Sequence, residues 1–217
     1  MFPLSKLVYS ALPISKKLAH RIEGKIMRLV LKNKNFTIIS NNCWGGGIYE
    51  DLDIPYQSPT VGLFFYAPCY IKFVSDLKGY LNLDFTEFVT DSAYPEANEF
   101  RKNHNWFYPI GILGDIEVHF MHFKTAEECI TKWNRRKTRI NWDQLYVKMC
   151  DRDLCNSEIR DQFLALPFPK KVFFGSQSLK KIDYIYLESY SGQPFVGSLY
   201  EEPWNYRKYF NLVKWLS

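Results

Sequence analysis

The chain has 217 residues, of which 47% are hydrophobic and 18% aromatic, and this composition argues against a disordered or fibrous protein. It favours one large domain with a sizeable core. The net charge of +5 is concentrated at the N-terminal end, because residues 1–34 carry +7 and the rest of the chain −2. We therefore expect no nucleic-acid partner, which would need a wider basic surface.

No apolar run reaches the roughly 18 residues that cross a bilayer, and the N-terminal segment lacks the pattern of a secretory signal. The five cysteines include no CxxC pair, so we expect neither a disulfide framework nor a structural zinc site. These features favour a cytoplasmic protein.

Residues 14–32 are predicted to form one helix. Its apolar residues recur three or four positions apart and are Leu18, Ile22, Ile26 and Leu29, while cations cover the remaining surface. Two interpretations stay open: a solvated outer helix packed on the domain, or a basic amphipathic helix lying on an anionic membrane surface. We therefore divide the chain into an N-terminal basic arm, residues 1–34, and a single α/β domain, residues 35–217.

Strand and helix patterns alternate along the rest of the chain. Strands are expected at residues 36–40, 60–65, 85–89, 108–113, 116–123, 145–150, 171–174 and 182–187. Helices are expected at residues 48–52, 68–81, 125–139, 156–165 and 203–216, and a surface loop at 91–107. Repeated β-then-α units predict a layered α/β/α fold around a mostly parallel, Rossmann-like sheet. Such sheets bind ligands beyond the carboxyl ends of their strands.

The segment Ser40–Gly47, which reads SNNCWGGG, follows a predicted strand and precedes a predicted helix. A thiol at such a turn lies near exposed backbone amides and a helix N-terminus, and both lower its pKa. Cys43 is thus a candidate nucleophile, with Asn41 or Asn42 as a donor to an oxyanion. The residues expected to contact substrate here are Ser40, Asn41, Asn42, Trp44, Gly45 and Gly46. The alternative is a tight turn in which Cys43 is simply buried.

Two histidines and an aspartate could complete a catalytic set with Cys43. His119 and His122 point to opposite faces of their predicted strand, so they are not expected to share a metal. His122 lies near the carboxyl end of that strand, where a base for Cys43 is expected, whereas His119 is deeper and is either structural or catalytic. Asp151 directly follows strand 145–150 and could orient the imidazole.

Other charged residues support a different chemistry. Asp151 and Asp153 could hold Mn²⁺ or Mg²⁺ on a nucleotide diphosphate, or could simply cap a helix. Arg135 and Arg136 lie at the cationic end of helix 125–139, where the helix macrodipole favours positive charge. Their guanidinium groups could also bind a phosphate or a carboxylate of the substrate.

Five motifs occur in an order that is specific to one known family: ISNNCWGG, SPTVGLFF, YPIGILGDIEVHFMHF, KWNRRKTRIN and KMCDRD. Across roughly residues 14–190 the chain resembles a bacterial domain-of-unknown-function family labelled exopolysaccharide biosynthesis protein and encoded in capsule and surface-polysaccharide gene clusters. The resemblance implies a cytoplasmic role in making or decorating a cell-surface glycan. It implies no catalytic residues.

Three functions follow as alternatives. The first is an O-acetylation-like acyl transfer or a hydrolysis on a glycan or its activated precursor, with Cys43 as nucleophile, His122 as base, Asp151 as orienting acid and a donor such as acetyl-CoA. The second is a metal-dependent glycosyltransferase or sugar-phosphate transferase that uses Asp151 and Asp153. The third is a non-catalytic assembly protein held at the inner face of the plasma membrane.

The first function predicts that Cys43, His122 and Asp151 converge at one rim of the sheet. This prediction assumes that strands 36–40, 116–122 and 145–150 are parallel, although the short Gly114-Asp115 link could instead produce an antiparallel pair.

Overall fold

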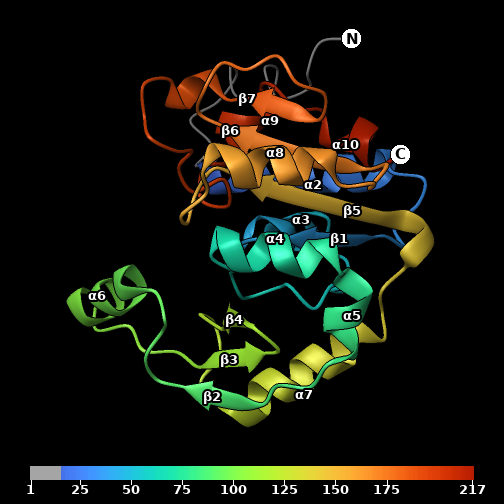
Figure 1. The fold of residues 1–217 in the computed structure, drawn as a ribbon. Coiled ribbons are helices and arrows are strands. Elements are labelled where there is room, and N and C mark those ends of the chain that lie inside the picture. The colour runs from blue at the N-terminus through green and yellow to red at the C-terminus, as the bar shows by residue number, and fades with distance from the viewer. Residues whose placement is uncertain (1–15) are drawn as a thin grey trace.

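Four parallel strands form the main sheet of the protein, whose computed structural model describes residues 16–217 (Figure 1). In sheet order they are β1 (Thr37–Ser40), β5 (Leu145–Cys150), β6 (Lys171–Gly175) and β7 (Tyr184–Tyr186). Their sequences are largely apolar without strict alternation, because both faces of the sheet are covered. The predicted α/β class with a mostly parallel sheet is confirmed.

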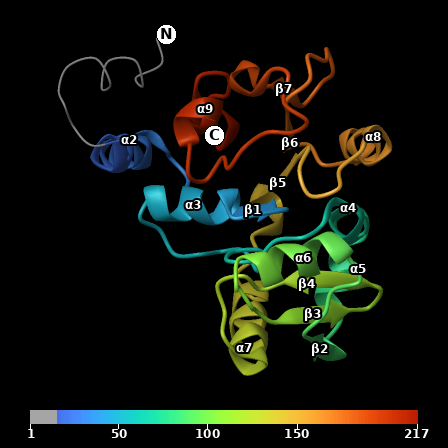
Figure 2. The same ribbon diagram turned by 90° about the vertical axis from the view of Figure 1, so that its left-hand side faces the viewer.

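Successive residues of the strands pack into two separate apolar clusters, one on each face of the sheet. Ile39 and Val147 belong to the first cluster, and Ile38 and Tyr146 to the second. On the first side lie α4 (Ala67–Ser75) and α8 (Ser157–Ala165), and on the second α3 (Trp44–Asp51), α9 (Pro203–Arg207) and α10 (Leu212–Trp215), as Figures 1 and 2 show. This arrangement is the expected layering of helices around a sheet.

A second, antiparallel sheet lies below the main one in Figure 1. Its strands are β2 (Glu87–Val89), β3 (Ile110–Leu113) and β4 (Ile116–His119), and it packs with α5 (Leu77–Asn82) and α7 (Ala126–Lys137). The expectation that residues 116–122 run parallel to β1 and β5 is wrong. The Gly114-Asp115 link is too short for a crossover, so β3 and β4 form a hairpin.

Other boundaries differ from the sequence prediction for local reasons. Residues 91–107 contain α6 (Pro95–Asn103), because Pro95 occupies the first helical position, where its missing N–H costs nothing. Asp76 ends α4 and caps α5 by accepting from the Gly79 amide, which divides the helix expected at 68–81. Residues 60–65 form no strand, but Phe64 makes an isolated antiparallel bridge with His119. The remaining short elements are 3₁₀ turns at Trp142–Gln144 and Glu188–Tyr190.

The N-terminal helix α2 (Lys16–Val30) packs against α3. Gly24 makes this close approach possible, because a Cβ at that position would lie 2.1 Å from the carbonyl oxygen of Asp51. The Arg207 guanidinium of α9 forms ion pairs with Glu23 at 2.6 Å and with Asp51 at 2.7 Å. Near the C-terminal end of α2, Leu29 is 85% exposed. Within residues 16–217, no helix is both long and apolar enough to traverse a bilayer.

Candidate functional site

Cys43 and His122 lie together although they come from different sheets. Cys43 is the N-cap residue of α3, directly after the turn that follows β1. His122 follows β4, and its Nε2 lies 3.4 Å from the Cys43 Sγ. This is the contact that a thiol nucleophile and its general base require.

A segment that leaves a turn at Gly62, residues 61–65, connects the two sides of this contact. The Phe65 amide donates to the Asn41 carbonyl at 3.0 Å, beside the Cys43 turn. The Phe64 amide donates to the His119 carbonyl at 2.9 Å, and the His122 amide donates to the Gly62 carbonyl at 3.3 Å. The segment therefore holds the end of β4 against the end of β1, even though the two strands do not pair.

Burial controls the protonation state of the nucleophile. Desolvation raises the pKa of Cys43 from 9.0 to about 11, and the positive charge of Lys148 offsets only part of this effect. The sequence predicted that the turn lowers the pKa of this thiol, whereas burial acts in the opposite direction, because the loss of hydration outweighs the favourable charge of Lys148. At neutral pH the resting group is a thiol, so a base must take its proton during reaction.

Beneath Cys43, the fully buried Lys148 of β5 organises the turn. Its Nζ donates to Asn41 Oδ1 at 3.1 Å and to Asn42 Oδ1 at 2.9 Å, and lies 3.4 Å from Cys150 Sγ. The side-chain amides of both asparagines donate to that same sulfur. The sequence suggested that one of these asparagines donates to an oxyanion. Both side-chain amides are instead already engaged with Cys150.

The first turn of α3 offers other donors. The backbone amides of Gly45 and Gly46 have no earlier carbonyl within the helix to donate to, as at every helix N-terminus. Gly46 lines a hollow beside Cys43. Asn42 and the largely buried Trp44 line the larger hollow, whereas Ser40 is fully buried, with its amide donating to Thr60. Among the six expected substrate contacts, the glycine amides therefore fit an oxyanion hole best.

Asp151 does not join the Cys43–His122 pair. One of its carboxylate oxygens accepts from the Ser176 amide and hydroxyl, at 2.7 and 2.8 Å, and the other accepts from the Val196 amide at 2.8 Å. Among the described residues it forms no hydrogen bond with His122. The expected convergence of three groups therefore holds for two of them, because the Asp151 carboxylate ties β6 and the 196 loop to β5.

Asp153 has a different environment from Asp151. It lines the larger hollow beside Cys43, and burial raises the pKa of its carboxyl, against the lowering effect of Arg152 and Lys148. Within residues 16–217, no group of three or more histidine, cysteine, aspartate or glutamate side chains is placed to hold a metal ion.

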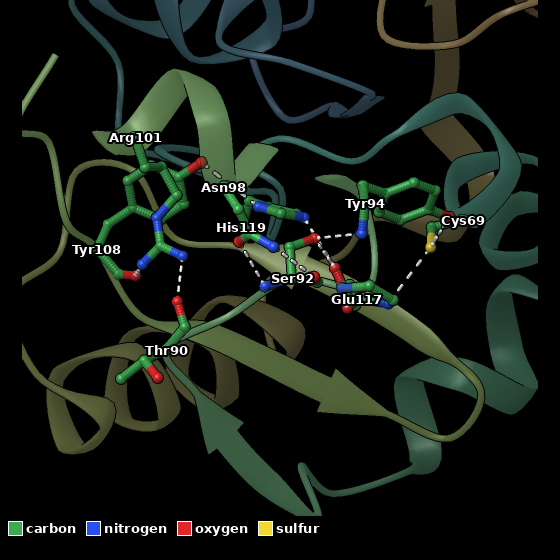
Figure 3. A network of polar contacts seen from close by, with 10 residues as sticks. Cys69, Thr90, Ser92, Tyr94, Asn98, Arg101, Tyr108, Glu117 and His119 are labelled. Atoms are coloured by element: carbon green, nitrogen blue, oxygen red, sulfur yellow. Dashed lines mark hydrogen bonds and ion pairs between the residues drawn. The ribbon is translucent and has the colours of Figure 1, made fainter. Parts of the chain in front are cut away.

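His119 is part of a buried network that Figure 3 shows. Its Nδ1 lies 3.4 Å from the Tyr108 hydroxyl, and its Nε2 lies 3.3 Å from Glu117 Oε2, which also accepts from the Ser92 hydroxyl. The second Glu117 oxygen accepts from the Ala93 amide. Burial lowers the pKa of His119, so this imidazole is neutral near pH 7.

The network around Glu117 fixes the segment that carries α6. Arg101 of α6 adds to it by donating to the carbonyls of Thr90 and Tyr108 (Figure 3). Phe100 and Trp106, on and just after α6, line the larger hollow. His119 is thus a structural residue that positions a wall of the site, rather than a base that faces Cys43.

Two hollows meet at Cys43, with volumes of about 470 and 320 Å³. Aromatic rings line much of the larger one, namely Trp44, Phe64, Tyr66, Phe100, Trp106, Tyr108, Phe195 and Tyr200. The smaller one is lined by His122 and by polar and charged side chains that include Glu50, Tyr56, Lys132 and Arg136. Arg135, the second arginine expected to bind substrate, is exposed on α7 and lines neither hollow.

Lys148 and, apart from Trp44, the aromatic lining were not anticipated from the sequence. Lys148 had a signal, since a lysine inside the apolar run LYVKMC must be buried with its charge. The other aromatic rings had no such signal, because they come from segments far apart in the chain.

Comparison with known proteins places the chain in a family. The model of a domain of unknown function, DUF1919, matches residues 14–217. The chain belongs to the DUF1919 family. A relative from Haemophilus influenzae (strain ATCC 51907 / DSM 11121 / KW20 / Rd), named only as an uncharacterized protein, is 32% identical over 199 residues, which cover 89% of this chain and 90% of the relative. The DUF1919 match includes helix α2 as well as Cys43 and His122, so the whole described site lies within the family domain.

Proposed function

We propose that the protein is a thiol-dependent enzyme that transfers or hydrolyses an acyl group on a sugar-containing substrate. The observation that carries this proposal is the 3.4 Å contact between Cys43 Sγ and His122 Nε2 at a strand-to-helix turn that opens on two hollows.

The proposed reaction has two stages. The Cys43 sulfur attacks the carbonyl carbon of the acyl donor while His122 Nε2 takes the thiol proton, and the imidazolium then protonates the leaving group. The product of this stage is a thioester on Cys43. In the second stage His122 removes a proton from water or a sugar hydroxyl, whose oxygen attacks the thioester and displaces the sulfur. The sulfur recovers its proton from the imidazolium.

Electrostatics around Cys43 suit both stages. Each stage places negative charge on a carbonyl oxygen, which the amides of Gly45 and Gly46 can stabilise. The positive charge of Lys148 beneath the turn favours the thiolate, as its lowering effect on the pKa of Cys43 indicates, although burial lowers the pKa of the lysine itself. The raised resting pKa makes His122 essential, because almost no thiolate is present without it.

The aromatic lining of the larger hollow supports a sugar substrate. Aromatic faces bind the apolar C–H faces of sugar rings, and the half-buried Asp153 offers acceptors for their hydroxyls. The resemblance to proteins labelled for exopolysaccharide biosynthesis favours a surface glycan or its activated precursor, with a donor such as acetyl-CoA. We place this activity in the cytoplasm, at the inner face of the membrane, where the exposed Lys25, Leu29 and Val30 of α2 would contact anionic lipid.

The test is the release of p-nitrophenol from p-nitrophenyl acetate, followed with and without a mixture of sugar acceptors. We expect release that Cys43→Ala abolishes and that sugars accelerate. Cys155→Ala is the matched control, since Cys155 is also partly exposed. Release that persists in Cys43→Ala would overturn the proposal.

A further inference from the structure

Arg136 is a buried cation at the wall of the smaller hollow. Its residue is only 6% exposed, and it lines the same hollow of about 320 Å³ as Cys43 and His122. The guanidinium carbon lies 5.0 Å from the ring centre of Tyr56 and 5.9 Å from that of Phe123. The rings fix the plane of the guanidinium group, which makes it a preorganised binding group.

The charge of Arg136 is not neutralised within the described part of the chain. Nη1 donates to the Val61 carbonyl at 2.7 Å, and no carboxylate in residues 16–217 forms an ion pair with the group. The buried Nε has no hydrogen-bond acceptor among these residues. A buried guanidinium with unused donors is costly unless an anion completes its contacts.

Lys132 adds a second cation one helical turn earlier on α7. It also lines the hollow, and its Nζ lies 3.0 Å from Glu128 on the partly exposed side of the helix. An exposed pair of this kind contributes little, so Lys132 can exchange Glu128 for a ligand. The one acid that lines the hollow, Glu50, accepts from the hydroxyls of Tyr56 and Tyr200.

We infer that Arg136 and Lys132 form a subsite for an anionic group, a carboxylate or a phosphate, on the molecule that reacts at Cys43. The inference rests on the proposed function for the identity of the reacting residue. It adds that the substrate or donor is an acid, such as a uronic acid or a sugar or nucleotide phosphate, rather than a neutral sugar ester. Guanidinium groups bind both kinds of anion through paired N–H donors.

Alkylation of Cys43 can detect this subsite without knowledge of the substrate. Iodoacetate and iodoacetamide attack the same thiolate, but only iodoacetate carries a negative charge, so the ratio of their rates cancels any change in the thiolate fraction. We expect Arg136→Gln to lower the iodoacetate-to-iodoacetamide ratio by about tenfold, the loss of one charge-assisted contact of about 1.4 kcal/mol.

Two variants control this experiment. Lys137→Gln removes a positive charge from the next residue of α7, which does not line the hollow, and should leave the ratio within about twofold of wild type. Arg136→Lys keeps the charge but not the paired donors, so the ratio should recover in part. An equal fall in Arg136→Gln and Lys137→Gln would show a general field effect and overturn the inference.

Direct binding measurements distinguish a phosphate from a carboxylate ligand, and they do not depend on the reactivity of Cys43. Calorimetry would measure binding of inorganic phosphate and of glucuronate to wild type, Arg136→Gln and Lys137→Gln. We expect one of these probes to bind wild type and Lys137→Gln alike, and Arg136→Gln about tenfold more weakly. Phosphate binding alone points to a phosphorylated donor, and glucuronate binding to an acidic sugar.

The inference and the proposed function can therefore fail separately. If neither probe binds, or if Arg136→Gln binds as wild type does, the subsite is overturned even when Cys43 is reactive. If Cys43 reacts with neither alkylating reagent but Arg136 binds phosphate or glucuronate, the nucleophile fails and the subsite stands.

Discussion

The pH dependence of Cys43 alkylation tests how burial sets the reactivity of the candidate nucleophile. The thiolate is the reactive form, and burial disfavours it, so the fraction of thiolate rises with pH. With a pKa of about 11 rather than 9.0, the thiolate fraction at neutral pH is about a hundredfold smaller than in an ordinary cysteine. The rate should therefore increase about tenfold for each pH unit from neutral pH towards pH 11.

The assay is the rate of iodoacetamide labelling of the Cys43 peptide, measured by mass spectrometry across this pH range. Cys155 provides an internal comparison, because burial raises its pKa to about 12 and it should react about tenfold more slowly than Cys43. A labelling rate that is already constant near neutral pH would reveal a stable thiolate–imidazolium pair. That result would refute the argument that desolvation outweighs Lys148 and the helix N-terminus.

Three further outcomes follow from the same contacts. His122→Ala should lower acyl transfer from p-nitrophenyl acetate by about 10²–10⁴-fold, the usual contribution of a general base, with an unchanged near-ultraviolet circular dichroism spectrum; equal rates would remove His122 from the mechanism. Arg207→Met removes the ion-pair partner of two largely buried carboxylates, so the free energy of unfolding measured in urea should fall by about 3–5 kcal/mol. The control Lys208→Met, at an exposed position, should change that free energy by no more than about 0.5 kcal/mol. Leu29→Gln should reduce flotation with anionic liposomes at low salt, and Ile182→Gln, which is 87% exposed against 85% for Leu29, should not; equal flotation of both variants would place lipid contact elsewhere.

Local sequence signals predicted much of the fold and half of the candidate site. The apolar strand followed by SNNCWGGG correctly indicated a strand-to-helix turn with Cys43 at its end. His122 was expected there because it lies near the end of a predicted strand, although β4 ends at His119 and belongs to another sheet, in which it pairs antiparallel with β3. The two groups meet through the bridge between Phe64 and His119, a tertiary pairing that no local pattern announces.

The remaining differences arise from burial and from long-range hydrogen bonds. The sequence correctly predicted that Asp151 follows β5. Its carboxylate, however, accepts hydrogen bonds from the amides of Ser176 and Val196, which are both distant in sequence. The pKa of Cys43 moves upward because neighbouring chain segments exclude water, and a sequence does not show which segments those are. The choice of Arg136 over Arg135 depends on which face of α7 meets the hollow.

The most direct measurement of the central claim is the capture of an acyl group on Cys43. The protein would be mixed briefly with p-nitrophenyl acetate, quenched in acid and digested, and its peptides analysed by mass spectrometry. The account predicts an acetyl group on the Cys43 peptide that hydroxylamine removes, as expected for a thioester, and that is much reduced in His122→Ala. Acetyl groups only on lysines or on other cysteines, with Cys43 unmodified, would contradict it.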